Sequence, residues 1–165
     1  MDFSIASILM LDGLTNGAIY ALLGMCLVLV FTVTRIIFIP QGEFVAYGAL
    51  TLAIFQTGQV PGTVWLLLIL AGVAALMDLA AVWRHRGRAA PALLAALRTF
   101  LPSAVVAAVS AWAAPRGLPM LVQAGLTVAI VTCFGPLVYR VAYQSLAGAS
   151  TLVLLIVSVG VHFAM

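Results

Sequence analysis

Residues 117–139, GLPMLVQAGLTVAIVTCFGPLVY, form a continuous stretch without a charged side chain. The stretch holds 23 residues between Arg116 and Arg140, and a helix needs about 20 apolar residues to cross the hydrocarbon core of a bilayer. A second charge-free stretch, residues 13–34, holds 22 residues between Asp12 and Arg35. Both stretches therefore predict membrane-spanning helices.

The composition of the whole chain indicates the same environment. Of the 165 residues, 65% are hydrophobic and 7% are charged, whereas soluble domains are about half apolar and a quarter charged. A water-soluble domain is therefore excluded. The arginines are spread among apolar stretches instead of forming a patch, which excludes nucleic acid as a partner and leaves the lipid bilayer.

The sequence also lacks the motifs of an enzyme. It contains no lysine, so it cannot hold the Gly-Lys-Ser/Thr motif of an ATP-binding phosphate loop. We find no nucleophile paired with a base, and no cysteine and histidine spacing typical of a metal site. We predict no catalytic residue, no metal and no cofactor.

Three further apolar stretches complete the expected fold. They cover residues 63–83, a shorter pass over residues 99–114, and a stretch that begins at Thr151. A broken element is expected near residues 36–57, where Pro40 and Gly42 interrupt the apolar pattern and a short helix starts around Pro40. We predict an all-α, polytopic transmembrane helix bundle with about five or six membrane segments, in a single domain of residues 1–165.

The arginines also predict the orientation in the membrane. With the N-terminus outside and the sides alternating, Arg116 alone falls outside. Six arginines then fall inside, as the positive-inside rule requires: Arg35, Arg84, Arg86, Arg88, Arg98 and Arg140. The same count results when the pass over residues 99–114 is left out, so that pass depends on its apolar character alone.

A stripe of small residues runs along the first predicted helix. Its members are spaced by four, four and three positions: Gly13, Gly17, Ala21 and Gly24. Such a stripe lets another helix approach closely, and helix packing is its simplest interpretation. The alternative is a face that lines a substrate path, with Asn16 and Tyr20 as its polar groups.

Two acidic residues each have two interpretations. Glu43 is expected in the first turn of the short helix, where it complements the helix dipole. Alternatively, Gln41, Gly42 and Glu43 shape a pathway, as broken helices do in transporters. Asp78 either reaches water at the inner leaflet or pairs with an arginine inside the protein.

Three blocks of the sequence resemble the LivH-type permeases of branched-chain amino-acid ABC transporters. Residues 12–22 are similar to the family's opening NGLxxGxxYAL, and residues 38–49 to its NFAHGEF and GAY segment. Residues 143–146 and 154–161 look like its RPLR and LLIxTIGVS stretches. Gly42 and Glu43 match the family pattern, whereas Pro40 and Gln41 stand where the family has Ala-His.

The resemblance implies a permease subunit of an ABC importer for branched-chain, hydrophobic amino acids in the bacterial inner membrane. The implied partners are a second permease subunit, two ATP-binding subunits and a periplasmic amino-acid-binding protein. Family members are longer, so we expect the chain to be an N-terminal portion of such a permease. Two alternatives remain open: an ion-coupled carrier that works alone, and a membrane assembly protein that transports nothing.

Overall fold

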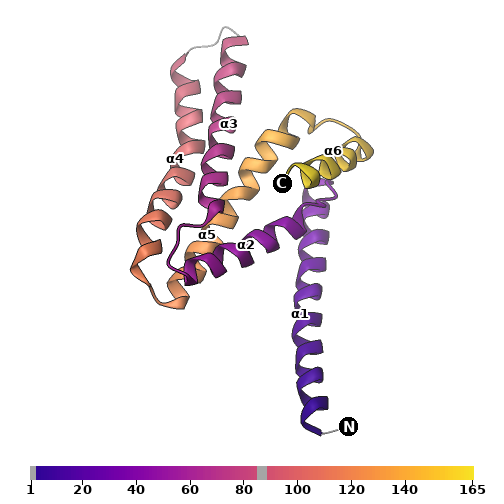
Figure 1. Ribbon diagram of the computed structural model, residues 1–165. Coiled ribbons are helices and arrows are strands. Elements are labelled where there is room, and N and C mark those ends of the chain that lie inside the picture. Colours follow the sequence, from indigo (N-terminus) through magenta and orange to yellow (C-terminus); the bar gives the residue numbers. More distant parts are fainter. Residues whose placement is uncertain (1–2, 85–88) are drawn as a thin grey trace. The chain divides into compact units, whose positions relative to one another are not determined.

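The computed structural model describes residues 3–84 and 89–165. It also describes their side chains, except those of residues 81–96 and 99. This part of the chain is helical almost throughout, with 87% of its residues in helices and no strand. Its α-helices are α1 (Phe3–Thr34), α2 (Gln41–Gln56), α3 (Gly62–Arg84), α4 (Ala89–Ala113), α5 (Met120–Val138) and α6 (Thr151–Ala164) (Figure 1). The all-α prediction is confirmed. Residues 85–88, which hold two of the arginines used for the orientation, lie outside the described residues.

Three helices in the described residues are long and apolar enough to cross a membrane. They are Phe3–Thr34, Gly62–Ala80 and Met120–Leu146, and Thr151–Ala164 is a shorter apolar helix. These helices indicate a membrane protein. The predicted stretch 13–34 lies within α1, which begins ten residues earlier because Asp12 interrupts the apolar composition without interrupting the helix.

The chain divides into two compact units. The first contains the residues up to Gln41 together with Ala149–Met165, and the second contains Gly42–Gly148. In the first unit, none of the described side chains of α1 is buried. The buried side chains of that unit lie in the connection after α1 and in α6, at Ile36, Pro40, Leu154 and Ser158. A helix that is apolar on all sides and exposed along its length needs lipid or a protein partner around it.

The break in the helical chain occurs where the sequence predicts it. Residues 35–40 are not helical, and α2 begins directly after Pro40. Arg35 ends α1 in a left-handed conformation, with φ of 57°, and its N–H donates to the Phe31 carbonyl at 2.8 Å. This is the geometry that usually closes a helix with glycine. The Thr34 hydroxyl accepts a hydrogen bond from the Ile36 N–H at 3.2 Å, which satisfies a backbone donor left free by the break.

In the second unit, α3 and α4 run antiparallel and side by side (Figure 1). The buried positions of this pair include Ala71 and Ala74 on α3, and Ala107 and Ser110 on α4. Small side chains let two helix backbones come close, which is how helices pack where water does not drive association. The residues predicted as a fourth pass, 99–114, thus belong to the α3–α4 pair, and their crossing of a membrane stays a prediction.

Helix α2 packs on α5 through aromatic rings. Phe134 of α5 is 1% exposed, and its ring lies edge-on to Phe44 and stacked with Tyr47, with centroid distances of 6.3 and 6.0 Å. A Cβ added at Gly48 would lie 3.7 Å from Val131, so α2 comes close to α5 at the next turn. These contacts join α2 to α5 within the second unit.

Ser110 allows a test of the α4 packing. Its Oγ is buried and has no hydrogen-bond partner among the described residues. Burial of an unpaired hydroxyl is costly, and alanine fills nearly the same space. We expect Ser110→Ala to raise the free energy of unfolding by about 1 kcal/mol, measured by thermal unfolding in detergent. The control is Ser7→Ala, at an exposed serine on α1. A loss of stability in Ser110→Ala would show that the hydroxyl has a partner.

Candidate functional site

The end of α5 is irregular, and this irregularity positions a charged residue. Pro136 lies inside α5, and the helix continues as a π-helix over Tyr139–Tyr143 that contains Arg140. Proline has no N–H to donate to the preceding turn, which weakens the regular hydrogen-bond pattern. Single π-helical turns inside α-helices occur frequently at functional sites.

Arg140 forms an ion pair with Asp78 of α3. Its Nε and Nη2 donate to Asp78 Oδ1 at 3.1 and 2.8 Å, and Nη2 lies 2.7 Å from Oδ2. The side chains are 30% and 17% exposed, respectively. A close carboxylate compensates the cost of keeping a guanidinium inside an apolar helix bundle. Of the two interpretations of Asp78, the structure therefore supports the arginine partner.

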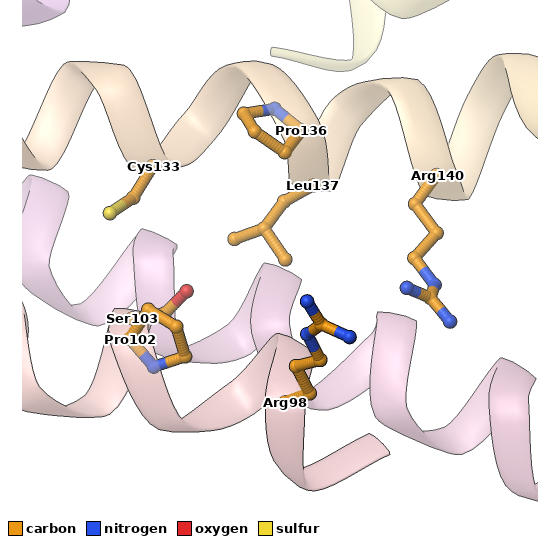
Figure 2. Close-up of a pocket in the computed structure, with 7 residues that line it drawn as sticks. All are labelled: Arg98, Pro102, Ser103, Cys133, Pro136, Leu137 and Arg140. Atoms are coloured by element: carbon orange, nitrogen blue, oxygen red, sulfur yellow. The ribbon is translucent and has the colours of Figure 1, made fainter. Parts of the chain in front are cut away.

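Beside this ion pair lies a cavity between α4 and α5. Its volume is about 540 Å³, and it is lined by Arg98, Pro102, Ser103, Cys133, Pro136, Leu137 and Arg140. Figure 2 shows Arg98 reaching from α4 toward the helix that carries Leu137, with the Ser103 hydroxyl also turned to that side. The basic side chains of the cavity lie toward one of its ends, and Pro102, Ser103 and Cys133 lie toward the other end (Figure 2).

The residues predicted at the helix break occupy the expected places in the chain. Gln41 is the first residue of α2, and Glu43 lies in the first turn of that helix. The Gln41 Nε2 donates a hydrogen bond of 2.6 Å to the Leu23 carbonyl of α1. Gln41 belongs to the first unit, and this bond ties it to a carbonyl 18 residues earlier in the same unit. A Cβ added at Gly42 would meet no atom of the described residues within 4 Å.

The residues predicted along α1 are all exposed. Asn16 and Tyr20 are exposed, as are the four members of the small-residue stripe, Gly13, Gly17, Ala21 and Gly24. A Cβ at any of these three glycines would meet no described atom within 4 Å. Close packing on this stripe and a substrate path along it both stay predictions, because they require a partner helix.

The cavity was not predicted from the sequence. In the sequence, Arg98 and Arg140 were used only to predict the orientation in the membrane, and Ser103 and Cys133 were assigned no role. The sequence did contain a signal for this cavity. Arg98 precedes one apolar stretch and Arg140 follows the next. A short connection makes two successive helices antiparallel, which brings these two ends together. For metal ions, no group of three His, Cys, Asp or Glu side chains gathers anywhere in the described residues.

Comparison with known proteins does not place the chain in a family. No family description, no curated protein and no solved structure matches it. Its candidate sites are therefore defined by geometry: the helix break with Gln41 and Glu43, and the cavity beside the Asp78–Arg140 ion pair.

Proposed function

We propose that the chain is part of the permease subunit of an ABC importer for hydrophobic amino acids in a bacterial inner membrane. In this proposal it forms a polytopic bundle, with its N-terminus on the periplasmic side. It contributes to the translocation path, and ATP is hydrolysed on separate subunits. The proposal combines the resemblance of three sequence blocks to LivH-type permeases with the geometry of the helix break.

The observation that carries the proposal is the break at residues 35–40. An apolar chain stops being helical for six residues and resumes at Gln41, with Glu43 in the first turn of the new helix. Non-helical backbone at membrane depth occurs only where protein or a water-filled cavity surrounds it. In transporters, such breaks build the substrate path and the moving gates. The Gln41–Leu23 hydrogen bond holds this break in one geometry.

The two alternative functions, an ion-coupled carrier and a membrane assembly protein, require different features of the chain. A carrier that works alone needs an acidic residue that gains and loses protons, and its candidates are Asp12, Glu43 and Asp78. Asp78 is already engaged by Arg140, which makes it the least suited of the three. An assembly protein needs only helix-packing surfaces, which the exposed stripe on α1 offers.

Uptake of radiolabelled leucine tests the proposal. The chain is expressed with a second permease subunit, ATP-binding subunits and a binding protein of LivH-type transporters, in cells that lack their own leucine uptake. We expect uptake that disappears when the ATP-binding subunits carry an inactive phosphate loop. Gln41→Leu removes one hydrogen bond of about 1 kcal/mol, and we expect it to lower uptake about fivefold.

The chain provides a matched control for Gln41. The Gln123 Nε2 donates to the Leu118 carbonyl at 3.0 Å, at the beginning of α5. Gln123→Leu therefore removes the same type of bond and is expected to leave uptake unchanged. Leucine transport by the purified chain alone, lost in Glu43→Gln, would instead establish the carrier. If no complex and no uptake are found, the permease proposal is wrong.

A further inference from the structure

The cavity between α4 and α5 has a basic end because of the order of its helices. The two helices are joined through Ala114–Arg116 and a short extended segment, so they run antiparallel and the beginning of α4 lies beside the end of α5. Arg98 lies one turn before Pro102 on α4, and Arg140 lies one turn after Pro136 on the α5 side. Both guanidinium groups therefore line the same cavity (Figure 2).

The charges at this end do not balance. Asp78 compensates Arg140, but Arg98 has no ion-pair partner among the described residues. The whole sequence contains only four acidic residues, and none of them lies in the segment 79–165. The cavity therefore carries a net charge of about +1. An arginine without an ion-pair partner at a cavity between apolar helices favours a bound anion.

The rest of the cavity favours an anion that is attached to an apolar group. Pro102, Cys133 and Leu137 form an apolar wall in the same cavity, and the buried Ser103 adds a hydroxyl. A volume of about 540 Å³ lies within the range of about 300–1,000 Å³ typical of sites for small molecules. Pro102 and Pro136, which both line the cavity, interrupt the regular hydrogen-bond pattern of α4 and α5 there.

We propose that this cavity binds a phosphate group, that of an anionic phospholipid headgroup. Arg98 supplies the free charge, Arg140 a second guanidinium, and the apolar wall contacts the beginning of the acyl chains. Basic pockets between membrane helices bind anionic headgroups in this way, and the cytoplasmic leaflet is rich in anionic lipid. The predicted orientation, with Arg98 and Arg140 inside, places the cavity at that leaflet. The proposal does not depend on the transport function.

Native mass spectrometry of the full chain in detergent tests this site. The chain is titrated with phosphatidylglycerol, and separately with phosphatidylcholine, which has no net charge. We expect tighter binding of phosphatidylglycerol, and about fivefold weaker binding in Arg98→Gln, since one arginine near an anionic headgroup contributes about that factor. Arg98→Lys keeps the charge and is expected to retain most of the affinity.

The matched control is Arg116→Gln. Arg116 is also exposed, but its guanidinium lies 3.3 Å from the Trp112 ring centroid, at the other end of α4. This variant has the same net charge as Arg98→Gln and is expected to bind phosphatidylglycerol like the parent chain. Circular dichroism and thermal unfolding check that both variants remain folded.

Each result decides the question. Equal affinities for the two lipids, or equal weakening in Arg98→Gln and Arg116→Gln, would overturn the site, because surface charge alone then explains the binding. Inorganic phosphate at millimolar concentration is added as a competitor. If it displaces phosphatidylglycerol from the parent chain but not from Arg98→Gln, the phosphate site stands and the lipid as its source is overturned. Failure of inorganic phosphate to compete supports the lipid.

Discussion

Asp78→Ala is expected to lower the free energy of unfolding by about 2–3 kcal/mol, measured by thermal or SDS-induced unfolding in detergent. The substitution leaves the Arg140 guanidinium without the carboxylate that accepts its hydrogen bonds at 2.8 and 3.1 Å. Removal of one partner from a fully buried ion pair costs about 3–5 kcal/mol. The smaller value applies here because Arg140 keeps 30% of its side-chain surface exposed and can turn toward water.

A double-mutant cycle separates the ion pair from its surroundings. Removal of both charges, in Asp78→Ala with Arg140→Gln, is expected to cost less than the sum of the two single variants, by about 2 kcal/mol. Asp12→Ala is the matched control, because Asp12 is an exposed aspartate within α1. Additive effects of the two substitutions would show that Asp78 and Arg140 do not interact in the folded protein.

Phe134→Ala is expected to lower the free energy of unfolding by a similar amount, about 2–3 kcal/mol, in the same assay. The ring is 1% exposed and packs between the rings of Phe44 and Tyr47. Removal of a buried phenylalanine costs about 3–5 kcal/mol in water-soluble cores. Helices in lipid gain packing but no transfer out of water, so the expected loss is smaller.

Phe3→Ala is the matched control for this cluster, because Phe3 is 91% exposed at the beginning of α1. It is expected to unfold like the parent chain. Phe134→Leu keeps an apolar side chain of moderate size and should recover part of the loss. Equal stability of Phe134→Ala and the parent chain would mean that α2 does not pack on α5 through these rings.

The helical character of the chain and the position of its break could be predicted from local sequence. Charge-free stretches such as 117–139 indicate helices because backbone groups in lipid must be satisfied within the segment. Pro40 indicates a new helix because proline lacks an N–H and has a fixed φ that suits the first turn. Each of these signals comes from neighbouring residues, and the structure shows α5 and the beginning of α2 where they predict them.

The environment of individual side chains was harder to predict. Asp78 had two interpretations, and the sequence favoured interfacial water over the arginine partner that the structure shows. The choice depends on how α3 is rotated toward the end of α5, 62 residues later. Helix α3 packs on both α4 and α5, and it buries small residues such as Ala71 and Ala74, which allow a close approach of helices.

The sequence by itself determined that this protein consists of apolar helices suited to a membrane, with one interruption before Gln41. Composition and local periodicity are sufficient for this, because the cost of exposing backbone and charge to lipid acts on each segment separately. Only the tertiary structure decided that Asp78 pairs with Arg140 and that Arg98 lines a cavity without an acidic partner among the described residues. These features require helices distant in sequence to meet at a particular rotation, which side-chain packing sets.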